Sequence, residues 1–163
     1  MARRHPSLIP LSHDHREALG LVFRLHNPAP PGRVTAMTPV STAASRATET
    51  IEFFSRHLET HFRAEEEALF PFLVARAELD DASGSLVERL IGEHRRLGEL
   101  RDAIEAAARG AGELEEALVA FGDLLETHVR TEERELFARF PADLPEDEAG
   151  PVAAAIRAAL GRD

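Results

Sequence analysis

Two segments of the chain carry the same pattern of residues that can bind metal ions. The first reads HFRAEEEALF from residue 61, and the second reads HVRTEERELF from residue 128. Each copy follows an apolar helical stretch that contains another histidine, His15 before the first copy and His94 before the second. The repeat therefore collects four imidazoles and two carboxylates, a donor set that suits a pair of metal ions.

The spacing within each copy places a histidine and a glutamate on the same face of a helix. His61 and Glu65, like His128 and Glu132, are four residues apart, so their side chains lie one helical turn apart, with about 6 Å between them. In that arrangement one side chain terminates a metal ion while the other bridges to a second ion. A buried carboxylate without a partner is costly, and the chain has no lysine. Arg101, the only arginine on these inward stripes, is expected near a helix end, so a metal ion is the predicted counter-charge.

The donor set also indicates which metals to expect. Because the chain has no cysteine, any metal must be held by nitrogen and oxygen donors. Four imidazole nitrogens, two bridging carboxylates and a solvent-derived bridge fill about ten of the roughly twelve positions of two octahedral ions, which leaves room for a small molecule. Structural zinc prefers a closed tetrahedral site. We therefore expect two iron ions, with manganese as the alternative.

The hydrophobic pattern that must position these residues has the period of helices, and no segment alternates as a strand would. The expected helices are residues 12–26, 39–77 with a kink or an end at Pro71, a third from the turn at 80–85 to about Gly110, 113–140, and a short fifth at 144–160. This all-α pattern predicts an antiparallel up-down-up-down four-helix bundle with a short C-terminal helix. We expect a single domain, residues 1–163, with its core at about 11–140 and an extension at 141–163.

Composition and charge argue against several other classes of protein. The chain of 163 residues is 44% hydrophobic and 29% charged, as is ordinary for a soluble globular protein. Its formal net charge of -10 argues against a surface for nucleic acid or anionic membranes. The apolar stretch near the N-terminus breaks at Ser12, too soon for a signal peptide or a spanning helix. We expect a cytoplasmic protein with no nucleic-acid or membrane partner.

With these motifs the chain resembles the hemerythrin family, specifically its HHE cation-binding branch, over about residues 11 to 140. The resemblance implies a non-haem di-iron centre inside the bundle, with Glu65 and Glu132 as the bridging carboxylates. The ligands that it implies are His15, His61, Glu65, His94, His128 and Glu132. The Glu-x-x-His pattern of ferritin-like di-iron proteins and the His-Glu-x-x-His pattern of metalloproteases are both missing from the chain.

The chain departs from oxygen-carrying hemerythrin in two places. That protein has a second histidine one turn after the ligand histidine of its third helix, and this chain has Gly98 at that position. Its last carboxylate ligand is an Asp five residues after the preceding ligand histidine, whereas Glu132 of this chain is four residues after His128. His57, one turn before His61, has two readings: it supplies a fifth nitrogen ligand, or it lines the ligand pocket. Its counterpart in the other copy is Leu124, so it breaks the symmetry of the repeat.

The remaining polar residues are weaker candidates. His13 is expected to be exposed, because it cannot share the face of His15 at a spacing of two. His5 is expected in a loose N-terminus. Glu66 and Glu133 are expected on a solvated face, with support of the ligand histidines as the alternative.

The resemblance implies that the centre meets a small ligand such as dioxygen, peroxide or nitric oxide. Three roles follow from it: storage or sensing of oxygen, an enzyme that decomposes peroxide or handles nitric oxide, and an iron-responsive regulatory module whose fold depends on metal. The family resemblance favours binding of dioxygen, whereas glycine at position 98 favours redox chemistry or sensing. A purely structural bundle would leave Glu65 and Glu132 buried without cause. The sequence identifies no protein partner.

Overall fold

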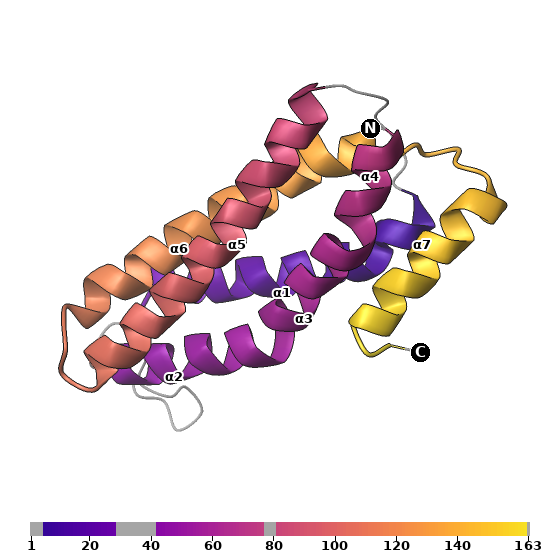
Figure 1. The fold of residues 1–163 in the computed structure, drawn as a ribbon. Coiled ribbons are helices and arrows are strands. Elements are labelled where there is room, and N and C mark those ends of the chain that lie inside the picture. The colour runs from indigo at the N-terminus through magenta and orange to yellow at the C-terminus, as the bar shows by residue number, and fades with distance from the viewer. Residues whose placement is uncertain (1–4, 29–41, 77–80, 163) are drawn as a thin grey trace.

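The computed structural model describes residues 5–28, 42–76 and 81–162, and nearly all of them are helical. Long helices lie side by side, and a shorter C-terminal helix packs across one end (Figure 1). No strand occurs among the described residues. The all-helical class predicted from the hydrophobic period is confirmed.

The first helix begins earlier than the pattern indicated. A 3-10 turn, η1 (Pro6–Leu8), leads into α1 (Ile9–His26), whereas the sequence predicted a start at Ser12. Pro10 sits in the first turn of α1, where a missing backbone N–H costs no hydrogen bond. His5 is also not loose, because its side chain is buried and accepts a hydrogen bond from the backbone of Ser7.

The second helical segment contains π-helical turns. Its elements, in order, are α2 (Ala43–Phe53), the π turn η2 (Phe54–Leu58), α3 (Glu59–Ala64), the π turn η3 (Glu65–Leu69) and α4 (Phe70–Arg76). Thr42 caps the start, and the predicted residues 39–41 and 77 lie outside the described residues. The segment does not end at Pro71, which is the second residue of α4. It changes direction between α2 and α4 (Figure 1), and η3 ends at Leu69, two residues before the proline.

The second half of the chain follows the predicted boundaries closely. Helix α5 (Asp81–Ala108) is joined by a glycine-containing turn to α6 (Leu114–Thr131), and the two run in opposite directions (Figure 1). Gly110 and Gly112 in this turn have positive φ, a conformation that glycine adopts readily. The π turn η4 (Glu132–Leu136) and the 3-10 turn η5 (Phe137–Arg139) continue α6, and α7 (Glu146–Ala159) is the predicted C-terminal helix.

The interior divides into two apolar clusters with a polar layer between them. Helix α6 packs along both α1 and α5, and α7 packs on α3 and η3. On α5, His94 lies between Leu90 of one cluster and Leu97 of the other. Both leucines are fully buried, and burial of each stabilises the fold by about 1.5–3 kcal/mol. The apolar clusters therefore seal the predicted ligands from solvent at both ends.

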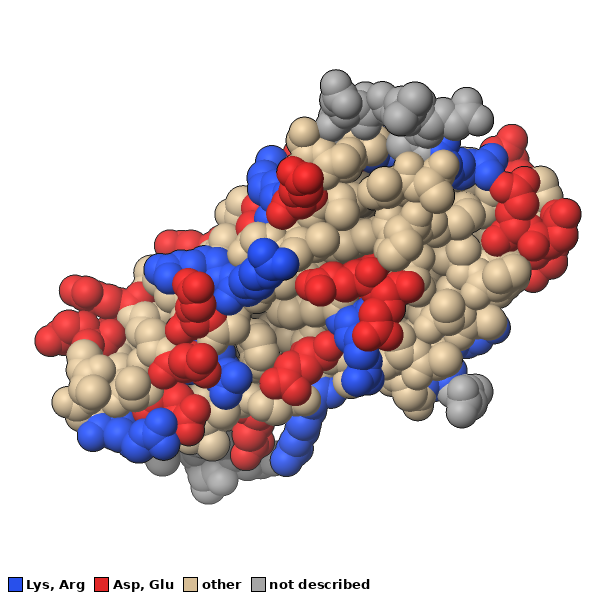
Figure 2. Space-filling model, in the orientation of Figure 1, with Lys and Arg blue, Asp and Glu red and all other residues tan. Residues whose placement is uncertain are grey.

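One face of the molecule is shown in Figure 2. Acidic and arginine side chains are interspersed over one half of it, and uncharged residues cover much of the other half. No helix among the described residues is long and apolar enough to cross a bilayer. The cytoplasmic location stays a prediction.

Candidate metal centre

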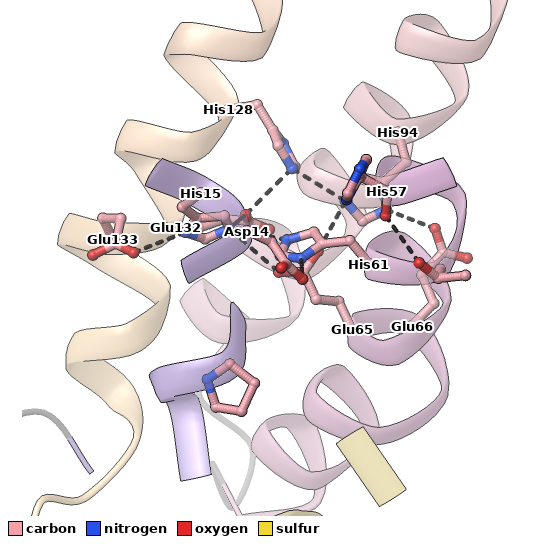
Figure 3. A network of polar contacts seen from close by, with 12 residues as sticks. Asp14, His15, His57, His61, Glu65, Glu66, His94, His128, Glu132 and Glu133 are labelled. Carbon is pink, nitrogen blue, oxygen red and sulfur yellow. Dashed lines mark hydrogen bonds and ion pairs between the residues drawn. The ribbon is translucent and has the colours of Figure 1, made fainter. Parts of the chain in front are cut away.

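Six of the seven predicted ligands meet in the polar layer between the apolar clusters. They come from α1, α3, α5 and α6 and from the first residues of η3 and η4, and their side chains point toward one another (Figure 3). All six are buried, and both glutamates are completely inaccessible to solvent. These six residues are His15, His61, Glu65, His94, His128 and Glu132.

The donor atoms form two groups that share both carboxylates. Within each group the atoms able to bind a cation lie within 4.8 Å of one another. Glu65 and Glu132 belong to both groups, as bridging ligands between two ions would. The first group is completed by His15 and His61, and the second by His94 and His128.

Distances across the centre show how the carboxylates span the two histidine pairs. Oε1 of Glu65 lies 3.2 Å from Nε2 of His61, and its Oε2 lies 3.4 Å from Nε2 of His94. Oε2 of Glu132 lies 3.0 Å from Nε2 of His15 and 3.3 Å from Nε2 of His128. Each carboxylate therefore contacts one histidine of each pair.

The other ring nitrogen of each of the four convergent histidines contacts a carboxylate on a different helical segment. The Nδ1 atoms lie 2.8, 3.2, 2.7 and 2.9 Å from these carboxylates in the pairs His15–Glu133, His61–Asp14, His94–Glu66 and His128–Glu93. Because a carboxylate only accepts, each Nδ1–H donates, and the Nε2 lone pair is left facing the centre. This pattern orients four imidazoles for binding a cation.

Sequence reasoning recognised only half of these outer carboxylates. Glu66 and Glu133 were expected on a solvated face; they are partly exposed, yet each accepts from a histidine. Asp14 and Glu93 were missed. The signal was present, because each stands directly before a ligand histidine, in Asp14-His15 and in Glu93-His94. Each copy of the repeat thus has an acidic residue directly before its first histidine and two consecutive glutamates beginning four residues after its second.

Phenylalanine rings hold the imidazoles from the apolar side. Phe62 stacks on His94 with ring centroids 3.9 Å apart, and Phe137 stacks on His15 at 5.2 Å. These contacts restrict the rings to one orientation, which reduces the entropy lost when a cation binds.

The inward-facing atoms fit a cation because they are all acceptors once the Nδ1 atoms carry the protons. Nε2 of His15 lies 3.0 Å from Nε2 of His61, and the equivalent distance between His94 and His128 is 3.2 Å. None of the carboxylate oxygens of Glu65 and Glu132 has a well-aligned hydrogen-bond donor, although all four are buried. The lone pairs of two Nε2 atoms about 3 Å apart repel each other unless a proton or a metal ion lies between them.

The surroundings of the histidines favour a proton at this place. Burial alone would lower the pKa of His61, but the charge of Glu65 and the hydrogen bond to Asp14 outweigh it and raise that pKa to about 10. For His94, burial again opposes charging, and its close contacts with the carboxylates of Glu65 and Glu66 raise the pKa to about 9. Burial would raise the pKa of Glu65, yet the histidines hold it well below its usual value. The field of the site therefore strongly favours positive charge at its centre.

Arg101 does not neutralise the two glutamates that the donor groups share. Its guanidinium lies 5.3 Å from the ring centroid of Phe54 and pairs with Asp102 and Glu105. Gly98, where oxygen-carrying hemerythrin has a histidine, also faces Phe54: a Cβ atom there would lie 3.8 Å from the ring. A Cβ atom at position 98 would therefore be in ordinary van der Waals contact with Phe54.

The structure does not bring His57 into either group of donors; its position agrees with the other reading, a histidine that lines the pocket. It lies in the π turn η2, whose wider turn removes the one-turn alignment with His61 that an α-helix would produce. Its ring stacks on Phe53 at 4.9 Å, and its Nδ1 lies 3.6 Å from Oε2 of Glu17. His57 is partly exposed, and it lines a pocket beside the first donor group.

That pocket is small and mostly apolar. The space open to the centre of a water-sized molecule is about 10 Å³, close to the minimum that one water needs. His15, His61 and His128 form its inner wall. Phe53 and His57 line this pocket and also a wider surface groove. The two side chains therefore separate the centre from solvent at this point.

Comparison with known families agrees with the arrangement of donors. The model of the hemerythrin HHE cation binding domain matches residues 10–140. The chain belongs to this family. Cation binding is the property that the family description states, and the two donor groups are the residues of this HHE domain suited to it. No curated protein and no solved structure shows a significant match to the chain.

The family match ends before α7. Residues 10–140 include all six convergent donors and the four outer carboxylates, whereas α7 (Glu146–Ala159) and the residues after it lie outside. The family match therefore does not describe this extension.

Proposed function

We propose that this HHE protein holds two iron ions and binds dioxygen or a related small ligand at them. The observation that carries the proposal is the sharing of two fully buried carboxylates by two groups of donors. Two ions bridged in this way would each receive two imidazoles and both carboxylates. Manganese suits the same donors, so the metal content of the protein is part of the test.

The proposal includes the antiparallel up-down-up-down bundle. Each ligand-bearing segment contributes one imidazole, and the outer carboxylates connect each segment to a neighbour in the order α1, α6, α5, α3 and back to α1. The opposite directions of α5 and α6 support this topology (Figure 1). Four segments joined in a ring around one centre are what a four-helix bundle with a metal core requires.

The pocket beside the first donor group supports a small ligand. Iron supplies redox activity and open coordination positions when bound. The chain itself supplies a cavity of one-molecule size lined by Phe62, Leu125 and Val129, which excludes bulk water. His57 and Phe53 limit entry to small molecules. A diatomic gas fits these dimensions, whereas an organic substrate does not.

Redox turnover of peroxide or nitric oxide is the second candidate, and the equal composition of the two donor groups favours it. Each group has two imidazoles and the same two carboxylates, and His57 adds no further nitrogen to one side. The two proposed ions would then be alike, and each would keep open positions. The third role, an iron-responsive module, requires that metal binding change the fold.

The deciding experiment follows the visible absorption of anaerobically reduced, iron-loaded protein when it is mixed with dioxygen and the solution is then purged of the gas. A new band that disappears on purging would support reversible binding. Rapid and irreversible oxidation would contradict it and direct the next assay to peroxide and nitric oxide. Glu67→Gln is the matched control for variants of the centre, because Glu67 is an exposed glutamate of the same π turn as Glu65. Iron content well below two ions per chain would overturn the proposal.

A further inference from the structure

The outer contacts of the two donor groups are related by the repeat, and an arginine completes one of them. In the second half, Nε of Arg89 lies 3.3 Å from Oε1 of Glu93, whose Oε2 lies 2.9 Å from Nδ1 of His128. Arg89 also donates to the hydroxyl of Thr131. Arg89 and Glu93 are four residues apart on α5, so one helix supplies both groups.

The first half cannot form this contact from its own helix. The residue four before Asp14 is Pro10, which has no side-chain donor. The arginine comes instead from the C-terminal end of the described chain. Nη2 of Arg162 lies 2.5 Å from Oδ1 of Asp14, and Oδ2 of Asp14 lies 3.2 Å from Nδ1 of His61. Arg162 also donates to the carbonyl of Pro10 at 3.5 Å.

The C-terminal helix ends in a way that directs Arg162 to this position. Gly161 has a φ of +65°, and the backbone N–H groups of Gly161 and Arg162 donate to the carbonyls of Ala158 and Arg157. These are the bonds of a Schellman motif, which turns the chain back at the end of a helix. Asp14 is almost completely buried, with 5% of its side chain exposed. The Arg162 side chain is 44% exposed, so the guanidinium reaches from the surface to a buried carboxylate and forms a charge-assisted bond with it.

Other contacts hold α7 against the helices that contain the first donor group. Ile156 is fully buried in the apolar cluster that includes Leu69 and Phe70. Arg63, two residues after His61, donates to the carbonyl of Ala159 at 3.1 Å. The extension is thus packed close to the ligand that Asp14 orients.

We propose that Arg162 is a positioning residue for the metal centre, so that docking of the C-terminal extension and binding of metal at the first donor group favour each other. The proposal rests on the proposed function, because it requires a bound ion. Arg162 restrains Asp14, and Asp14 orients the ring of His61. A cation on Nε2 makes the Nδ1–H of His61 more acidic and strengthens its bond to Asp14. By linkage, the metal must stabilise the docked tail as much as the tail stabilises the metal.

The test measures metal affinity and tail protection in the full chain, with Co²⁺ as the probe. Arg162→Gln is compared with Arg157→Gln, a matched loss of charge at an exposed position of α7, and with Arg162→Lys as the conservative variant. Removing an outer partner typically costs 10–100-fold in affinity. Arg162 contacts Asp14 and does not contact the histidine itself, so its effect should be smaller. We expect Arg162→Gln to weaken the Co²⁺ affinity of one of the two binding steps about three- to tenfold. Arg162→Lys should recover part of the loss.

Hydrogen exchange supplies a second readout that activity does not influence. Co²⁺ should increase protection of the peptide that covers residues 146–163 in the wild type and in Arg157→Gln, but much less in Arg162→Gln. A double-mutant cycle tests the route: in an Asp14→Asn background, Arg162→Gln should weaken binding no further.

The outcomes separate this proposal from the function on which it rests. If the wild type binds two Co²⁺ ions while Arg162→Gln binds both with unchanged affinity and unchanged tail protection, Arg162 has no positioning role. An additive loss in the double mutant would also overturn the route through Asp14. If the wild type binds no metal, both the proposed function and this inference are wrong.

Discussion

Glu65→Gln is the sharpest perturbation of the proposed centre. Glu65 is completely buried and is shared by both donor groups, with one oxygen 3.2 Å from His61 and the other 3.4 Å from His94. Glutamine keeps the size of the side chain but removes the charge. Each donor group then falls from four strong ligands to three, so a single substitution is expected to weaken both sites.

The size of the effect follows from linkage between binding and stability. A ligand at 100 times its Kd stabilises the folded state by about 2.7 kcal/mol per site, and for a protein of this size about 1 kcal/mol shifts Tm by roughly 2–4 °C. Two sites would then raise the Tm of the wild type by about 10–20 °C. Loss of a direct ligand costs at least as much as loss of an outer partner, about 100-fold. At the same metal concentration each site would contribute only about 0.4 kcal/mol.

The assay is thermal unfolding with and without metal, and the quantity compared is the metal-induced rise in Tm. Absolute Tm is not suitable, because Glu65→Gln also removes the partner of charged histidines in the metal-free protein. Glu67→Gln, an exposed substitution of the same type, should keep the full rise. A Glu65→Gln variant that retains the wild-type rise would refute the bridging role.

Three further predictions follow from the geometry. Asp14→Asn should weaken metal binding about 10–100-fold in a titration, because Asp14 orients His61 without binding the ion itself; the exposed Asp143→Asn should leave affinity unchanged. The pKa values of His61 and His94 are raised to about 10 and about 9. Their protons therefore stabilise the metal-free protein fully below about pH 6.5, and this stabilisation is lost as the pH rises toward those values. Metal must displace the same protons, so the gap in Tm between loaded and metal-free protein should widen from pH 6 to pH 8.5; a constant gap would contradict the protonated empty site. His57→Ala should change the rate of reaction with dioxygen, measured by stopped flow, and leave metal stoichiometry unchanged; half the metal content would instead restore His57 as a ligand.

The six convergent donors were predictable from the sequence because their relations are local. His61 and Glu65, like His128 and Glu132, share a helix face through the i, i+4 relation, which needs no knowledge of neighbouring helices. The placement of histidines on apolar stripes also predicted that they would be buried. The repeat added the remaining constraint, since two copies of one pattern imply two similar donor groups. For the same reason most helix ends were predicted within a few residues, the start of the first helix being the clearest error.

Only the tertiary structure decided the contacts between helical segments. The outer partner of each histidine lies on a different segment, so it depends on how the segments pack and not on spacing along one of them. His57 lies in the π turn η2, which does not keep the face spacing of an α-helix, so only the packing of the segments places it in the pocket wall and outside the two donor groups. Arg162 is 148 residues from Asp14, and no periodicity relates them. Hydrophobic period and local spacing determined which residues face inward, whereas packing of the helices determined which of them meet.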